Sequence, residues 1–148
     1  MNDNAKHSFA LGTDHAGFLY KEAIKSFLLA KGHEVKDFGT FSEESVDYPA
    51  FVKPAARAVS EGICKLGIVL GGSGNGEAMA ANKIPGVRCA LCWNEESARK
   101  AKEHNDANML SLGQRMISEE TAINIIKEWL AADFEGGRHV GRINMLDE

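Results

Sequence analysis

The sequence lacks several features that would place it in a protein class at once. Its apolar runs are short and interrupted, so none is long enough to span a bilayer. Acidic residues outnumber basic ones by 21 to 17, a formal net charge of −4, so there is no basic field to attract nucleic acid or an anionic membrane. We therefore expect no nucleic-acid or membrane partner, and any anionic ligand must be held by a few local cations.

Two further shortages concern location and redox chemistry. The first residues, MNDNAKHS, have no apolar stretch of the secretory type, and we expect a cytoplasmic protein. There are only three cysteines, an odd number that does not suit a disulfide framework. Cys89 and Cys92 lie three apart in an expected strand, on opposite faces and roughly 10 Å apart, beyond disulfide reach. We expect both to be buried core thiols.

Short apolar runs alternate with helical patterns along the chain. Strands are expected at residues 7–14, 33–39, 66–72, 87–93 and 107–113. Helices are expected at residues 17–32, 47–62, 77–81, 94–105 and 118–132, with a short last helix within the tail 134–148. Asn94 and Ser118 are candidate N-terminal caps of two of these helices.

This alternation predicts an α/β protein with a parallel sheet, because parallel strands need helical crossovers. The expected fold is a three-layer α/β/α sandwich with a doubly wound, five-stranded, Rossmann-like sheet, and residues 1–148 form a single domain. Ligands bind such folds beyond the carboxyl ends of the strands. The residues at those ends are Asp14 with His15, the loop 71–77, Asn94, and residues 113–115.

The loop GGSGNGE, residues 71–77, combines glycines with a glutamate. It matches neither the dinucleotide-binding G-x-G-x-x-G spacing nor the lysine ending of a P-loop. Glu77 would repel a permanently bound phosphate, but it suits a general base that removes a proton beside a carbonyl. The loop amides would then stabilise the developing oxyanion, and burial is expected to raise the pKa of Glu77. The alternative is a tight turn with Glu77 favourably placed at a helix N-terminus.

The other polar groups allow two interpretations each. Asp14 is either the N-cap of the next helix or a catalytic group, and His104 ends a helix where the dipole favours a cation. Arg138 and Arg142 are four residues apart on the expected last helix and, with Arg115, suit an anion such as phosphate. The alternative for these arginines is a solvated tail.

Taken together, these residues resemble the ribose-5-phosphate isomerase B family, which includes isomerases of galactose 6-phosphate. The resemblance is carried by LGTDHAG, DYPAF, GIVLGGSGNGEAMAANKIPGVRCAL, EHNDANMLSLGQRM and GRHVGRI, in that order along nearly the whole chain. The glycine-loop segment is its most specific part. The sequence looks most like the branch that uses glutamate as base, because the cysteine of another branch is replaced here by Gly71.

The resemblance implies interconversion of D-ribose 5-phosphate and D-ribulose 5-phosphate in the pentose phosphate pathway, without metal or cofactor. By match to the family motifs, Glu77 moves the proton through an enediolate, Ser73 assists the hydroxyl proton, and His104 with Asp14 opens the sugar ring. The substrate-binding positions are His15, Tyr48, Gly72, Gly74, Asn75, Gly76, Asn105, Arg115, Arg138 and Arg142.

The resemblance also implies a homodimer, in some members paired into a tetramer, with the site shared between subunits and the tail 134–148 packed on the partner. A six-carbon aldose phosphate, such as galactose or allose 6-phosphate, is the alternative substrate. A non-catalytic phosphate-binding module is the alternative from another class. A phospho-receiver would need an aspartate where the third strand ends in Gly71-Gly72, and Glu77 disfavours a nucleotide site.

Overall fold

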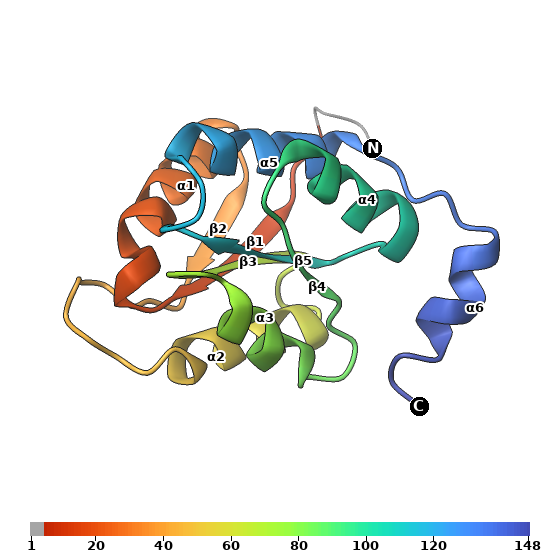
Figure 1. Cartoon of the computed structure of the whole chain (residues 1–148), viewed down its shortest axis with the longest axis horizontal. Helices are drawn as coiled ribbons and strands as arrows, with labels where there is room; N and C mark the ends of the chain where they lie inside the picture. The colour runs from red at the N-terminus through yellow and green to blue at the C-terminus, as the bar shows by residue number, and fades with distance from the viewer. Residues whose placement is uncertain (1–4) are drawn as a thin grey trace.

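Five parallel strands form one sheet at the centre of the computed structural model, which describes residues 5–148 (Figure 1). Residues 1–4, part of the segment considered for a signal, lie outside the described residues. The strands are β1 (Ser8–Thr13), β2 (Glu34–Asp37), β3 (Leu66–Gly71), β4 (Cys89–Leu91) and β5 (Met109–Gly113). Their order in the sheet is β2-β1-β3-β5-β4, and every neighbouring pair is parallel.

Helices cover both faces of the sheet, as predicted (Figure 1). One face packs against α1 (Phe18–Ala30), α4 (Glu95–Asn105) and α5 (Glu119–Ala131), and the other against α2 (Pro49–Ser60) and α3 (Asn75–Asn82). A short 3-10 helix, η1 (His15–Gly17), precedes α1, and α6 (Arg138–Asn144) lies at the edge of the molecule. Within residues 5–148, no helix is both long and apolar enough to cross a membrane.

Side chains of the central strands alternate between the two faces. Ile68 and Leu70 join the core under α1, α4 and α5, whereas Val69 joins the core under α2 and α3. Cys89 and Cys92 are free thiols buried in opposite cores, which confirms their prediction as core residues. Burial raises the pKa of the Cys92 thiol to about 12, so this sulfur is neutral at physiological pH.

Most elements differ from their expected bounds by one or two residues at an end, and two of the differences are instructive. Helix α3 begins at Asn75, two residues early, because Gly74 takes a left-handed conformation (φ 84°) that turns the chain directly into the helix. Strand β4 spans only Cys89–Leu91, and the Asn82 side chain donates to the Cys89 carbonyl (2.9 Å) and accepts from its N–H (2.8 Å). The expected caps are confirmed: the Asn94 side chain accepts from Ser97 N–H before α4, and the Ser118 side chain accepts from Thr121 N–H before α5.

Candidate active site

The carboxyl ends of β1, β3 and β5 lie side by side at one edge of the sheet, because β3 pairs with both of the other strands. The segment after β5 is bonded to the glycine loop after β3. Gln114 N–H donates to the Gly71 carbonyl (2.9 Å), and Arg115 N–H donates to the Gly72 carbonyl (3.0 Å). The loop 71–77 and residues 113–115 therefore form one joined surface beyond the strands, as the sequence predicts.

Glu77 lies inside this surface, in the first turn of α3. Its residue exposure is 4%, so the carboxyl group is almost completely removed from solvent. The carboxyl group lies directly against the Cα of Gly71, and a Cβ atom added there would overlap all three carboxyl atoms. Gly71 therefore provides the space in which the Glu77 carboxylate lies.

The environment of Glu77 raises its pKa above the ordinary value, as predicted. Burial is the largest cause, since it disfavours the charged form. The backbone N–H of Glu77 itself acts in the opposite direction, the charge of Asp14 raises the pKa further, and the backbone N–H of Gly74 lowers it. The net result is a carboxyl group that holds its proton to higher pH than a solvated glutamate and is a stronger base when ionised.

Tyr48 and Arg115 flank the glycine loop on two sides. A Cβ atom at Gly76 would lie 2.6 Å from Cζ of Tyr48, so the phenol ring rests on the glycine backbone. A Cβ atom at Gly72 would lie 3.0 Å from Nη1 of Arg115, which places the guanidinium beside the loop. A hydroxyl donor and a permanent cation thus lie next to the segment that carries the buried carboxyl.

Ser73 and Asn75 form the exposed part of the loop. The Ser73 hydroxyl accepts from Asn75 N–H (3.2 Å), which orders the turn into α3. Below them the buried Ser111 hydroxyl donates to the Gly74 carbonyl (2.7 Å) and ties the loop to β5. The Ser73 hydroxyl keeps its own proton available for another acceptor.

Asp14 and His15 follow β1 at the same edge. The buried Asp14 side chain accepts from Ala16 N–H (2.9 Å) and Gly17 N–H (3.3 Å), which confirms that it caps the following helix. It is also close enough to raise the pKa of Glu77. His15 accepts from Val46 N–H through Nδ1 (3.1 Å), so in this hydrogen bond the ring proton is on Nε2.

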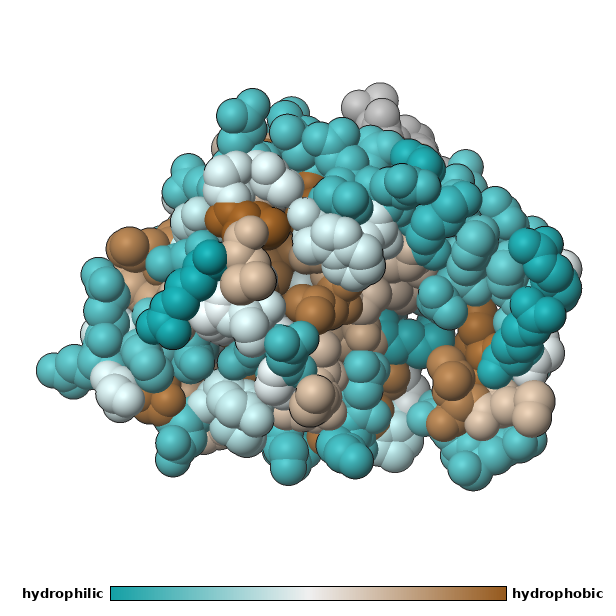
Figure 2. Space-filling model, viewed as in Figure 1, coloured by the Kyte–Doolittle hydropathy of each residue, from teal (hydrophilic) through white to brown (hydrophobic). Residues whose placement is uncertain are grey.

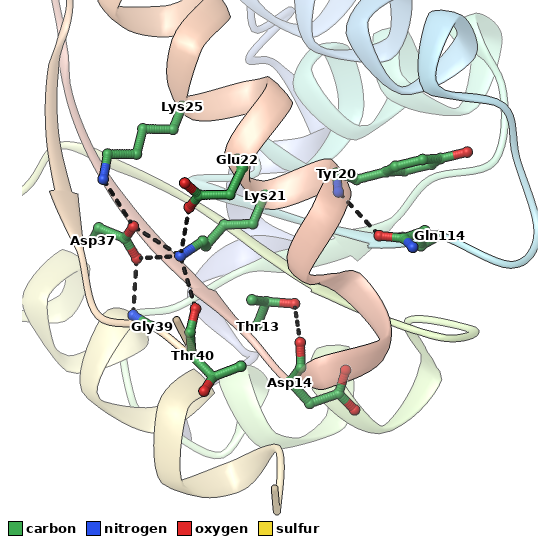
Figure 3. A network of polar contacts seen from close by, with 10 residues as sticks. All are labelled: Thr13, Asp14, Tyr20, Lys21, Glu22, Lys25, Asp37, Gly39, Thr40 and Gln114. Carbon is green, nitrogen blue, oxygen red and sulfur yellow. Dashed lines mark hydrogen bonds and ion pairs between the residues drawn. The ribbon is translucent and has the colours of Figure 1, made fainter. Parts of the chain in front are cut away.

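A buried lysine supports the carboxyl end of β1 (Figure 3). Lys21, with no exposed surface, donates to both carboxylate oxygens of Asp37 (3.0 and 2.8 Å) and to the Thr40 carbonyl (2.8 Å). Thr40 N–H in turn donates to the Thr13 carbonyl (2.8 Å), directly before Asp14. This network, which sequence analysis did not identify, holds the segment after β2 against the site.

The segment bearing Arg115 is held in the same way from α1 (Figure 3). Tyr20 N–H donates to Oε1 of Gln114 (3.0 Å), and the Tyr20 hydroxyl donates to the Ile117 carbonyl (2.8 Å). These hydrogen bonds hold the chain on either side of Arg115, and the exposed Arg115 side chain lies beside the glycine loop.

Four other predicted site residues lie elsewhere: His104, Asn105, Arg138 and Arg142. Helix α4 starts at the carboxyl edge of the sheet and runs back to the amino edge, where the Asn105 carbonyl accepts from Nε of Arg88, the residue before β4 (3.0 Å). Arg138 and Arg142 lie on the exposed helix α6, which packs next to α4. A single chain therefore brings together only the half of the predicted site that contains Glu77.

Three of these residues, His104, Asn105 and Arg142, line a pocket of ≈ 280 Å³ together with His139. The rings of His104 and His139 are stacked, with centroids 4.5 Å apart and planes 17° from parallel. His139, which is buried, was not among the predicted residues. It lies within the quoted motif GRHVGRI, but only the packing of α6 on α4 distinguishes it from its exposed neighbours.

Several known proteins are similar to this chain along most of its length. The family described as Ribose/Galactose Isomerase matches residues 9–146. Ribose-5-phosphate isomerase B of Escherichia coli is 42% identical over 137 residues, covering 93% of this chain and 92% of that protein. The solved ribose-5-phosphate isomerase B of Clostridium thermocellum is 47% identical, with a TM-score of 0.93 and 95% of each chain covered. The Mycoplasma genitalium enzyme, solved with bound ribulose-5-phosphate, is 38% identical, with a TM-score of 0.89 and 93% and 91% covered.

Proposed function

The chain belongs to the ribose/galactose isomerase family, and we propose that it interconverts D-ribose 5-phosphate and D-ribulose 5-phosphate with Glu77 as the base. The buried carboxyl of Glu77, set against Gly71 at the start of a glycine loop, is the observation that carries this proposal. The related enzyme with ribulose-5-phosphate bound supports the choice of a five-carbon sugar phosphate.

The chemistry is a proton transfer between two neighbouring carbons. The Glu77 carboxylate takes the proton from C2 of the open-chain aldose, the C–H electron pair forms the C1–C2 double bond, and the carbonyl oxygen becomes an enediolate oxygen. Glu77 then returns a proton to C1, while a hydroxyl proton moves from O2 to O1 with Ser73 as the relay. The charge that leaves Glu77 appears on the substrate oxygen, where loop N–H groups stabilise it.

The raised pKa of Glu77 suits both halves of this cycle. A base must be ionised to accept the C2 proton, yet it must hold that proton long enough to deliver it to C1. A carboxyl with an ordinary pKa of about 4.3 is a weak acceptor for a carbon acid. Burial of Glu77 brings its pKa closer to the working pH.

A second copy of the chain completes the site in this proposal. Glu77, Tyr48 and Arg115 come from the carboxyl edge of one subunit, and His104 and Arg142 come from the pocket beside α6 of its partner. Symmetry about a twofold axis then makes two equal sites per dimer.

The surface around α6 supports its contact with another subunit. Val140, Met145 and Leu146 are exposed by 44%, 65% and 62%, and Figure 2 shows apolar side chains at the surface near the end of the chain. Large apolar side chains that are exposed together mark interaction surfaces. A partner subunit that covers these side chains would bring its glycine loop next to Arg138 and Arg142 of the first subunit. The two arginines would then bind the substrate phosphate in the partner's site.

The direct test is proton NMR of ribose 5-phosphate with the purified protein in D₂O. We expect ribulose 5-phosphate to appear, with deuterium entering the transferred position. Glu77→Gln should lose both signals, whereas Glu119→Gln, which changes an exposed glutamate in the first turn of another helix, should retain them.

Three outcomes would change the proposal. Conversion at the wild-type rate by Glu77→Gln would remove Glu77 from the role of base. Binding of ribose 5-phosphate without exchange or conversion, together with conversion of allose or galactose 6-phosphate, would move the activity to six-carbon sugars. Failure to bind any of these sugar phosphates would leave only the family and the fold.

A further inference from the structure

Two histidines and a glutamate converge beside α6, away from Glu77. Nε2 of His139 is 3.4 Å from Oε1 of Glu135, and Nε2 of His104 is 3.8 Å from the same oxygen. One ligand atom from each of the three residues lies within 4.8 Å of the other two. The three side chains thus form a compact cluster of two imidazoles and one carboxylate.

The backbone holds this cluster together. Glu135 N–H donates to the Glu103 carbonyl (3.0 Å), which fixes the chain after α5 against the last turn of α4, next to His104. Gly136 and Gly137 then take positive φ angles of 67° and 58°, and the chain turns sharply into α6. The turn brings His139 back over His104, so three residues from two separate segments meet.

The buried side of the cluster has an unsatisfied nitrogen. The His139 side chain is 8% exposed, and its Nε2 is the one buried side-chain polar atom within residues 5–148 that has no hydrogen-bond partner. An unpaired buried polar atom costs about 1–3 kcal/mol, so such atoms are rare unless something binds them. This nitrogen lies close to the Glu135 carboxylate and the His104 imidazole, two groups that commonly bind metal ions.

We propose that His104, Glu135 and His139 bind a divalent ion of the zinc class. Two imidazole nitrogens and one carboxylate oxygen are a common zinc ligand set, with one position left for water. Zinc bonds of about 2.0–2.1 Å in a tetrahedron separate the ligand atoms by about 3.3 Å. The present separations of 3.4 and 3.8 Å from Oε1 of Glu135 are close to that value.

Two features determine which ion fits. The imidazole planes are nearly parallel, so one ring must turn before both nitrogens point at one ion; the His104 side chain, 35% exposed, has the room to do so. Arg142 lines the same pocket and opposes positive charge, and Glu135 is the one carboxylate of the cluster. Mg²⁺ and Ca²⁺ require several oxygen ligands and are therefore disfavoured, whereas Zn²⁺, Ni²⁺ and Cu²⁺ accept nitrogen ligands.

The ion would act as an inhibitor. In the proposed function His104 helps to open the sugar ring, and this consequence of metal binding rests on that function. A nitrogen that donates its lone pair to a metal is no longer available for proton transfer. Filling the site would therefore stop the isomerase, and a chelator would restore it.

The test is isothermal titration of Zn²⁺ into untagged protein that has been dialysed against a chelator, in the absence of sugar. We expect one ion to bind per chain. The Kd for Zn²⁺ should rise by roughly tenfold or more in Glu135→Gln and in His139→Asn. Glu103→Gln, which changes a neighbouring carboxylate outside the cluster, should bind Zn²⁺ like the wild type. Circular dichroism and melting without metal would show that each variant is folded.

The outcomes separate the metal site from the isomerase. Absence of binding by the wild type, or equal binding by folded Glu135→Gln and His139→Asn, would overturn the proposal. Inhibition by Zn²⁺ that persists in Glu103→Gln and disappears in Glu135→Gln would support it fully. Binding through the three residues without inhibition would uphold the metal site and contradict only the role proposed for His104.

Discussion

Gly71 and Glu77 share one space: the carboxyl group of Glu77 fills the volume that any side chain at position 71 would occupy. Gly71 ends β3 and Glu77 lies in the first turn of α3, so the contact closes the loop between them. A glutamate at position 77 of α3 and a side chain at position 71 of β3 therefore cannot occupy these places together. The overlap gives a steric reason why a glutamate at position 77 is combined with glycine at position 71 in this chain.

Gly71→Ala should lower kcat by displacing Glu77, with a smaller effect on KM. A displacement of about 1 Å in a reacting group costs roughly 100-fold in rate. Steady-state kinetics with ribose 5-phosphate measure both constants.

A double-mutant cycle distinguishes displacement of Glu77 from general damage to the loop. In Glu77→Ala, where no carboxyl is present, adding Gly71→Ala should cause little further loss, because the overlap is gone. Losses that simply add in the double variant would contradict the steric link between the two residues.

Glu77→Gln should stabilise the protein at neutral pH while lowering kcat by roughly 10²–10⁴-fold. The folded-state pKa of Glu77 is raised, chiefly by burial, so the unfolded chain loses this proton at lower pH than the folded chain. The free energy of unfolding therefore falls as pH rises above about 4.3, the pKa of glutamate in the unfolded chain. The loss of stability persists at neutral pH. Thermal melts should show a higher Tm for the variant at pH 7 and no difference below about pH 4. A lower Tm at pH 7 would contradict the raised pKa.

Mixing two variants should show whether the site is shared between subunits. Glu77→Gln removes the base, and Arg142→Ala should raise KM by roughly ten- to a hundredfold through loss of a charged phosphate contact. If the two residues come from different subunits, each mixed dimer contains one intact site. Subunit exchange in an equal mixture should then restore roughly a quarter of the wild-type activity, assayed well below KM.

The alternative outcome is equally definite. If Glu77 and Arg142 of one chain served the same site, no mixed dimer would contain an intact site, and activity would stay at the level of the separate variants. Exchange itself can be followed with a mass-labelled subunit.

Asp37→Asn should destabilise the protein by about 1.5–3 kcal/mol at pH 7, because buried Lys21 would lose its charged hydrogen bonds to Asp37 and keep only the half-exposed Glu22 (3.0 Å) as a carboxylate partner. Burial alone would raise the pKa of Asp37, but hydrogen bonds from Lys21, Gly39 and Lys25 outweigh it and lower the pKa. This carboxylate therefore stabilises the fold above the unfolded value of about 3.9, and the stabilisation is lost as pH falls through the lower folded value.

Denaturant unfolding between pH 2 and 7 checks this prediction. The wild type should lose stability more steeply than Asp37→Asn in the acid range below about pH 4. Asp106→Asn is the matched control: its carboxylate is 37% exposed and pairs with Lys102 at the surface, so the change should stay within about 1 kcal/mol. Similar losses in both variants would argue against a special role for the buried pair.

The order of strands and helices was determined by the sequence itself. Apolar periodicity and capping residues are local signals, and they placed all five strands and helices α1 to α5 to within a few residues. The local pattern also predicted that Asp14, the loop 71–77 and Arg115 would meet, because carboxyl ends of parallel strands share one edge. It predicted the opposite burial of Cys89 and Cys92 from the two-residue period of a strand.

Only the tertiary structure decided which side chains exclude or support one another. The overlap of Glu77 with position 71, the burial of Lys21 on Asp37, and the stacking of His139 on His104 join residues from separate elements. The division of the predicted site between the carboxyl edge and the amino edge of the sheet was decided in the same way. These relations depend on distances across the packed fold, which no local period in the sequence encodes, because packing joins residues irrespective of their separation along the chain.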